Sequence, residues 1–121
     1  MPTGLIYGMT TIGKAAGYER LMPLLETMLK DFQDLAKKKS DGVLNRAKIL
    51  AVNALLKDVF AVIQSEENAK YLKLLEEDDV PQYSDVVILL GQTVAAMGVF
   101  HDKFYGHSVH GYGWAVPAAK Q

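Results

Sequence analysis

Hydrophobic residues recur at the three- and four-residue spacing of amphipathic α-helices in four stretches of the chain. The first stretch has an apolar stripe on one helix face and charged residues around the rest of the circumference. The stripe consists of Tyr18, Leu21, Leu25, Met28, Phe32 and Leu35. Because a proline is best tolerated in a first turn, Pro23 predicts that this helix begins near residues 20 to 23 and runs to Lys38. The Ser40-Asp41-Gly42 cluster then predicts a turn that caps the next helix.

The second predicted helix, from about Val43 to Gln64, is apolar around most of its circumference. A helix of this kind has to be surrounded by other elements, so we expect it at the centre of the fold. Ser65 is then expected to cap a third, short helix from Glu66 to about Glu77. The buried stripe of this third helix consists of Ala69, Leu72 and Leu75.

The fourth stretch, from Val86 to about Phe104, has an ambiguous period at its start. The run from Val86 to Gly91, taken alone, would also suit a buried strand. A helix is favoured because apolar residues continue to Phe104 and because no other segment offers a convincing partner strand. Gly91, Ala95 and Gly98 share one face of this helix. Such a stripe of small residues would let another backbone approach closely.

The two ends of the chain carry a weaker helical signal. Residues 106–121 are rich in glycine and aromatic residues, which predicts an ordered loop or extended arm. Residues 1–18 keep helical spacing at a few apolar positions, but each of their four glycines weakens a helix by about 1 kcal/mol relative to alanine. The expected architecture is all-α, with a single domain over residues 1–121. It comprises a bundle of four main helices, an optional fifth helix at the N-terminus, and a C-terminal arm.

Composition narrows the classes of function. The 121 residues carry 13 basic and 14 acidic side chains, a formal net charge of −1, so no basic surplus predicts nucleic-acid binding. The chain has no cysteine, which excludes disulfides and thiolate nucleophiles and fits a reducing compartment. Glycines interrupt the apolar start, unlike a secretory signal, and the longest uncharged apolar run, Val86 to Phe100, is shorter than the roughly 20 residues needed to span a bilayer. We therefore expect a cytoplasmic protein with no membrane partner.

Charged residues are distributed unevenly along the chain. Residues 19–79 carry 22 of the 27, whereas residues 1–18 carry one and residues 80–121 carry four. Two mostly apolar helices and two apolar ends present more hydrophobic surface than four short helices easily cover. Large exposed apolar patches mark partner surfaces, which predicts a homo-oligomer or binding to a larger protein. The alternative is that both ends fold back over the second and fourth helices.

The segment after the fourth helix concentrates the side chains that could carry chemistry. Its candidate ligands for a divalent metal such as zinc are His101, Asp102, His107 and His110. The H-x-x-H spacing lies in a glycine-rich loop of undefined geometry, and no H-E-x-x-H pattern is present. The alternative interpretation of His101 is a packed side chain. Ser108 lies in an incomplete nucleophile-elbow pattern and no nucleotide-binding motif occurs, so an enzymatic function has little support.

Aromatic side chains separated by glycines are the other feature of this segment. Tyr and Trp are enriched in interface hot spots, whereas single-stranded nucleic acid would also require interleaved basic residues. The sequence therefore predicts a small interaction or assembly protein that binds itself or a larger protein through its apolar ends. The alternative is a metal- or ligand-binding protein, or an enzyme, built on the histidines. The candidate partner-binding residues are Tyr105, Tyr112, Trp114, Gly91, Ala95 and Gly98.

Overall fold

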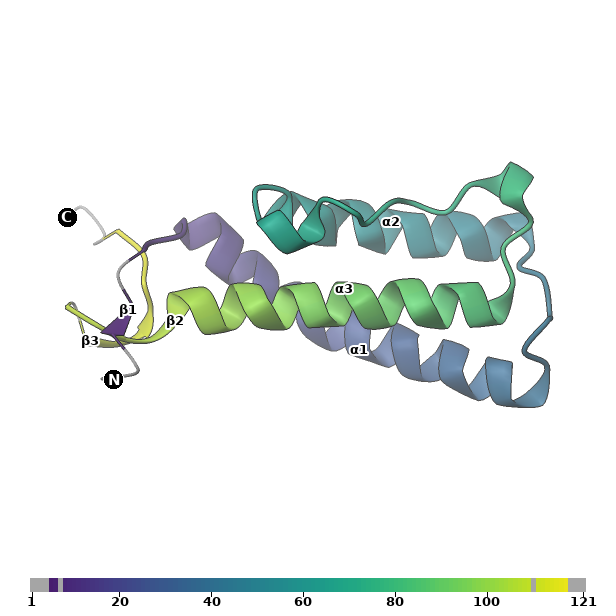
Figure 1. The fold of residues 1–121 in the computed structure, drawn as a ribbon, viewed down its shortest axis with the longest axis horizontal. Helices are drawn as coiled ribbons and strands as arrows, with labels where there is room; N and C mark the ends of the chain where they lie inside the picture. Colours follow the sequence, from purple (N-terminus) through teal and green to yellow (C-terminus); the bar gives the residue numbers. More distant parts are fainter. Residues whose placement is uncertain (1–4, 7, 110, 118–121) are drawn as a thin grey trace.

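Three packed α-helices and a small sheet form the computed structural model, which describes residues 5–6, 8–109 and 111–117 (Figure 1). The helices are α1 (Ile12–Lys38), α2 (Arg46–Ile63) and α3 (Tyr83–Phe104). Helix α1 packs against both of the others and runs antiparallel to them, so α2 and α3 point in the same direction (Figure 1). The expectation of a mainly helical protein is confirmed, but the expected bundle of four main helices is not what forms.

Helix α1 begins earlier than predicted. The Thr11 side chain caps it by accepting a hydrogen bond of 3.0 Å from the backbone N–H of Lys14. Pro23, expected in the first turn, lies inside the helix. Residues from Ile12 onward are therefore the first turns of α1, and the optional separate N-terminal helix is absent from the described chain. At Gly17 the helix passes close to α2, because an added Cβ would lie 2.8 Å from Cγ2 of Val62.

The connection between α1 and α2 does not provide the predicted cap. Asn45 caps α2 instead, accepting a hydrogen bond of 2.8 Å from the N–H of Lys48. The preceding residues pair with the chain before α3: Tyr83 donates to the carbonyl of Gly42 at 2.8 Å, and Leu44 donates to the carbonyl of Pro81 at 2.9 Å. These long-range hydrogen bonds hold the chain extended, which delays the start of α2.

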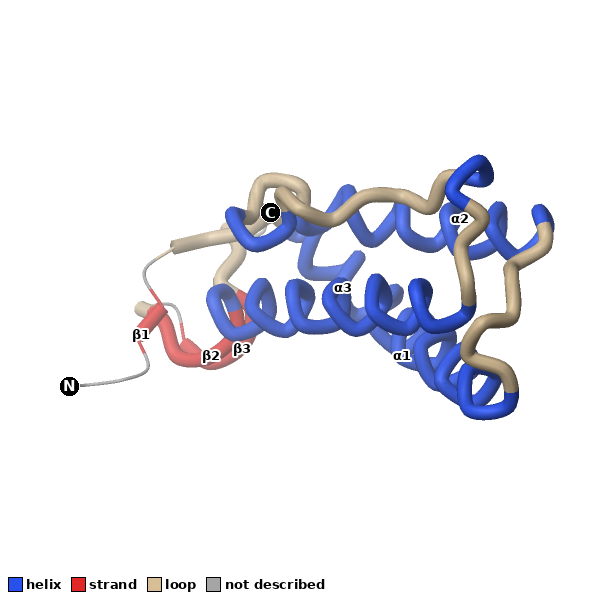
Figure 2. Tube along the Cα trace, turned by 45° about the vertical axis from the view of Figure 1, so that its right-hand side comes forward, coloured by secondary structure: helices blue, strands red, loops and turns tan. Residues whose placement is uncertain are grey.

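The prediction of a third helix from Glu66 to about Glu77 is wrong. Residues 64–82, the crossover segment, contain only two short 3-10 helices, η1 (Glu67–Ala69) and η2 (Glu77–Asp79). Between these turns the chain lies extended along α2, drawn as a loop in Figure 2. This connection has to cover the length of the bundle because α2 and α3 run in the same direction (Figure 1).

A side chain of α2 holds the crossover segment in its extended form. The Asn53 amide donates to the carbonyl of Leu75 at 2.9 Å, and its oxygen accepts from the N–H of Leu75 at 2.8 Å. Both backbone groups of Leu75 are thereby satisfied outside a helix. At the other end, Lys14 Nζ donates to Ser65 Oγ at 3.2 Å and Lys103 Nζ donates to Glu66 Oε1 at 3.0 Å. The helical spacing of Ala69, Leu72 and Leu75 is overridden by these contacts.

The hydrophobic core lies between the three helices. Its largest fully buried side chains are Phe100, Leu25, Leu56, Ile63, Leu90, Met97, Val52, Val59 and Val86. Helix α2 was expected to be surrounded, but its Leu50 is 57% exposed, and α3 leaves Ile88 60% exposed. The amphipathic α1, rather than α2, is the helix that packs against both others. Two apolar helices therefore each present an outward face.

The two ends of the chain meet in a three-stranded sheet in place of the predicted loop or arm. The strands are β1 (Leu5–Ile6), β2 (Tyr105–Ser108) and β3 (Gly111–Trp114), in the order β1-β2-β3. Strand β1 is parallel to β2, and β3 is antiparallel to it, with Tyr105 opposite Trp114. Gly111 and Gly113 have φ of +113° and +134°, a backbone conformation that favours glycine. The same glycines that predict a loop thus allow a short hairpin.

Candidate functional site: the aromatic cluster and the outer face of α3

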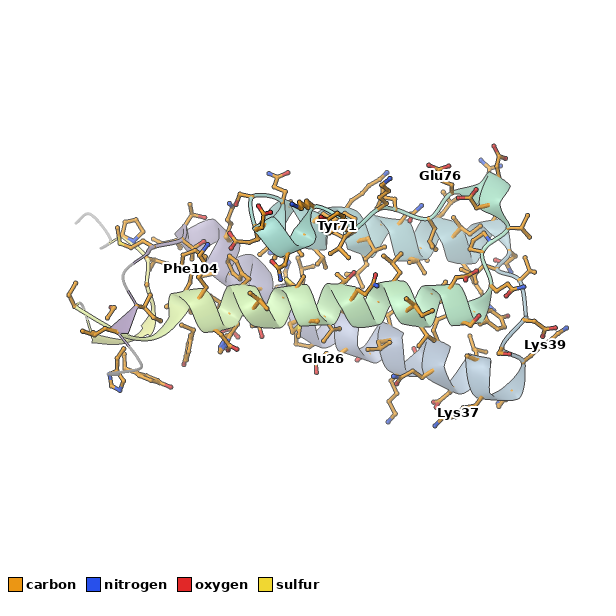
Figure 3. All side chains as sticks on the ribbon, viewed as in Figure 1. Glu26, Lys37, Lys39, Tyr71, Glu76 and Phe104 are labelled. Atoms are coloured by element: carbon orange, nitrogen blue, oxygen red, sulfur yellow. The ribbon has the colours of Figure 1, made fainter. Side chains whose placement is uncertain are left out.

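An aromatic cluster fills the end of the bundle where α1, α3 and the sheet meet. Its members are Tyr18, Phe100, His101, Phe104, Tyr105 and Trp114. The His101 ring stacks on Tyr105 with 4.6 Å between centroids, and the Tyr18 and Trp114 rings meet edge to face at 5.3 Å. The label of Phe104 in Figure 3 marks this end of α3. The interpretation of His101 as a packed side chain matches this geometry.

Trp114 attaches the hairpin to the helices. Its indole Nε1 donates a 2.9 Å hydrogen bond to Glu19 Oε1 of α1, and its ring lies 5.8 Å from that of Phe100. The next residue, Ala115, donates to the carbonyl of Phe104 at 2.7 Å and accepts from the N–H of Thr10 at 2.9 Å. Segments near both ends of the chain therefore cover the core at α1 and α3, whereas the alternative sequence interpretation expected them over the second and fourth helices.

The aromatic residues predicted to anchor a partner differ in their surroundings. Trp114 and Tyr105 pack within the cluster, whereas Tyr112 is 69% exposed on β3. The Tyr112 ring contacts those of Tyr105 and His107 edge to face, at 5.6 Å and 4.8 Å. Of the three, Tyr112 is the side chain with most of its surface available to a partner.

The predicted metal ligands are not gathered into one site by the described residues. His101 Nδ1 lies 3.2 Å from Asp102 Oδ1, while His107 lies on β2 against Tyr112. His110 falls outside the residues that the structure describes. Over residues 5–6, 8–109 and 111–117, no group of three or more His, Asp or Glu side chains is placed to hold a metal ion.

Burial raises the pKa of the Tyr18 phenol above its ordinary value of 10.0, and the carboxylates of Glu19, Glu26 and Asp102 raise it further. A raised pKa in the folded state means that the unfolded chain loses this proton first as the pH rises. The contribution of Tyr18 to stability is therefore complete below pH 10.0 and is lost as the pH rises toward and through its folded-state pKa.

This shift gives a prediction for alkaline solution. Between about pH 9 and pH 11, the free energy of unfolding is expected to fall more steeply for the unaltered chain than for a Tyr18→Phe variant. Urea denaturation at a series of pH values measures the difference, and tyrosinate absorbance of the folded protein should lose a component that titrates above pH 10.0 in the variant. Parallel pH profiles for the two chains would contradict the assignment.

The outer face of α3 is the second candidate surface. It consists of Ile88, Gly91, Gln92, Ala95, Gly98 and Val99. Ile88 is 60% exposed and Val99 is 52% exposed, so this face is uncharged, mainly apolar and open, with Gln92 as its polar member. Sequence reasoning identified the small residues of this face but missed Ile88 and Val99, which a helical projection of residues 83–104 would have placed beside them.

The two glycines of this face have no packing function within the described chain. Apart from the backbone of α3 and the two residues next to each glycine, no described atom lies within 4 Å of the position that a Cβ would occupy at Gly91 or Gly98. A glycine in the middle of a helix lowers helix stability by about 1 kcal/mol relative to alanine. The fold accepts this loss twice, although a Cβ would fit at both positions.

Helix α3 is also long and apolar enough to cross a membrane by length and composition. A third of its most apolar window, 33%, is buried inside the fold. Core helices of water-soluble proteins pass the same test, so length and composition do not assign the helix to a bilayer.

Open grooves flank the helices. The larger, of about 810 Å³, lies between α2 and the crossover segment and includes Leu50, Phe60 and Leu72 in its lining. A smaller groove of about 480 Å³ lies between the sheet and the end of α3, lined in part by Tyr105, His107 and Tyr112. Both grooves are shallow and open to solvent.

Comparison of the chain with protein-family models, curated proteins and solved structures gives no match.

Proposed function

We propose that this protein is a small helical assembly protein that binds a second copy of itself through the outer face of α3. The observation that carries the proposal is the open, apolar surface around Gly91 and Gly98, where no neighbouring element of the described chain needs a glycine. Contiguous apolar surface of this kind is typical of protein-binding sites. Small residues on such a surface permit close approach of another helix.

The distribution of charge supports a contact on one side of the molecule. The exposed side of α1 is charged, and Glu26 and Lys37 project away from the bundle (Figure 3). The middle of the α3 outer face, from Ile88 to Val99, carries no charged residue. Burying the α3 face therefore removes apolar surface from water without desolvating a charge at its centre.

The size of the face sets the expected strength of binding. A helix of 22 residues is about 33 Å long and one helix wide, which places the contact near the lower end of specific interfaces. We therefore expect association at micromolar to millimolar concentrations rather than a permanent complex. The exposed Tyr112 and Val109, 69% and 79% exposed at the hairpin, offer a second, smaller apolar contact.

The test compares two substitutions of similar chemistry on different helices. Ile88→Asp places a charge in the α3 outer face, and Leu50→Asp places the same charge on α2, where exposure is nearly equal. Light scattering over a dilution series is expected to show a dimer for the unaltered chain and for Leu50→Asp. The Ile88→Asp variant is expected to keep the 13.3 kDa mass of the monomer at every concentration.

Circular dichroism serves as the folding control, because both replaced side chains are exposed and neither variant should lose helix content. A monomeric mass for the unaltered chain throughout the dilution series would overturn the proposed function. Equal loss of assembly in the two variants would show that the contact is not specific to α3, which would also overturn the proposed function.

A further inference from the structure

We infer that the two copies pair α3 against α3 in antiparallel orientation, about a two-fold axis passing near Ala95. This inference rests on the proposed self-association and specifies how the second copy is seated. A symmetric dimer presents the same patch on both copies, so the patch has to be complementary to itself. The outer face of α3 meets this condition in its shape and in its charge.

The shape of the face is nearly symmetric about its middle. Ala95 lies at the centre, Gly91 one helical turn before it and Gly98 nearly one turn after it. An antiparallel pair brings Gly91 of each copy beside Gly98 of the other, on both sides of the axis. No atom of a neighbouring element lies within 4 Å of the Cβ position at either glycine. The two backbones can therefore approach closely at these crossing points.

The two ends of the face differ in charge, so each end is complementary to the opposite end of a second copy. Asp85 lies in the first turn of α3, and Lys103 follows 18 residues later, five full turns that return it to the same side of the helix. An antiparallel two-fold pair sets Asp85 of each copy opposite Lys103 of the other. A parallel pair would instead set both Asp85 carboxylates at one end of the interface and align the two helix dipoles in the same direction.

Both charged groups retain capacity for a further contact. Asp85 Oδ2 accepts a 2.8 Å hydrogen bond from the N–H of Gln82, which leaves the second carboxylate oxygen available. The Lys103 ammonium donates to Glu66 at 3.0 Å, has two further N–H donors, and belongs to a side chain that is 56% exposed. The ion pairs across the dimer thus form without breaking contacts of the monomer.

The absence of cysteine makes a cross-linking test direct. We consider single variants Ile88→Cys, Ala95→Cys and Asp102→Cys, oxidised under mild conditions. In the antiparallel pair, Ala95→Cys lies beside its own copy near the axis and is expected to become mainly covalent dimer. The two copies of residue 88 are about 21 Å apart along the helices, as are the two copies of residue 102, far beyond the roughly 7 Å limit for a disulfide.

A mixture of two variants completes the pattern. Positions 88 and 102 lie equally far from Ala95 on opposite sides, so Ile88→Cys and Asp102→Cys are expected to cross-link with each other and not with themselves. Ala51→Cys, an exposed alanine in the middle of α2, is the matched control for Ala95→Cys and is expected to remain uncross-linked. Reducing and non-reducing electrophoresis measures each product.

The outcomes separate this inference from the function on which it rests. Self-cross-linking of all three α3 variants would indicate a parallel pair, which overturns the antiparallel arrangement and leaves self-association through α3 intact. Cross-linking of Ala51→Cys as strongly as Ala95→Cys would overturn the arrangement too. A chain that stays monomeric, with or without flotation on phosphatidylcholine vesicles, would overturn both proposals, and flotation would identify lipid as the occupant of the face.

Discussion

A Phe100→Ala variant is expected to lose about 3–5 kcal/mol of unfolding free energy, the largest single effect in this molecule. Phe100 is fully buried, and its ring contacts those of Phe104 at 5.3 Å, Trp114 at 5.8 Å and Tyr18 at 6.3 Å. The substitution therefore leaves a cavity where α1, α3 and the hairpin meet. The cost combines the lost transfer of apolar surface from water with the lost packing around that cavity.

Urea denaturation followed by circular dichroism measures this loss, with Phe60→Ala as the matched control. Phe60 is a half-buried phenylalanine of α2, so its truncation should cost well under half as much. Because small domains are stable by only about 5–15 kcal/mol, a loss of this size can remove the native baseline of Phe100→Ala. In that case Phe100→Leu is measured in its place, with an expected loss of about 1–2 kcal/mol of unfolding free energy. Equal losses at positions 60 and 100 would contradict the packing described for Phe100.

The Trp114→Ala variant is expected to lose about 3 kcal/mol of unfolding free energy and to keep its capacity for self-association. The indole ring contacts four other rings of the aromatic cluster and donates its N–H to Glu19, so its removal frees the hairpin from both helices. Thermal and urea denaturation measure the stability. Light scattering of the same sample, at a temperature where it is folded, measures the assembly.

The two measurements distinguish the possible roles of Trp114. A side chain that packs within its own chain changes stability, whereas an anchor in a partner changes assembly and leaves the stability of the monomer unaltered. Trp114→Phe is the conservative control: it keeps an aromatic ring and loses the hydrogen bond to Glu19, for an expected cost of about 1–3 kcal/mol. Loss of the dimer at unchanged monomer stability would restore Trp114 as an intermolecular anchor.

The elements that sequence periodicity predicted well are those that long runs of residues specify. Helix α3 was predicted from Val86 to Phe104 and is observed from Tyr83 to Phe104, with the ambiguity at residues 86–91 resolved as helix. The small residues on one face of this helix were also identified, since a helical period determines which residues share a face. Whether that face is covered could not be deduced, because the neighbours of a face come from distant parts of the chain.

The sequence predictions that the structure contradicts failed for a common physical reason. The spacing of Ala69, Leu72 and Leu75 suits a helix, but Asn53, 22 positions before Leu75, pairs with both of its backbone groups and holds the chain extended. Strand β1 is two residues long and pairs with a strand near the other end of the sequence, so no local pattern predicts the sheet. Apart from proline, local propensities differ by about 1 kcal/mol per residue or less, which a few long-range contacts outweigh.

By itself, the sequence determined that this protein is mainly helical, favoured a helix over residues 86–104, and placed small residues on one face of that helix, while it left His101 open between a packed side chain and a metal ligand. These properties follow from hydrophobic periodicity and from the conformational preferences of single residues, which act within a few turns of chain. The tertiary structure alone decided that α1 rather than α2 packs against both other helices, that the crossover segment is extended, and that the ends join in a sheet. It also decided that Trp114 closes the core while the α3 face stays open, because such exposure depends on contacts between residues far apart in sequence.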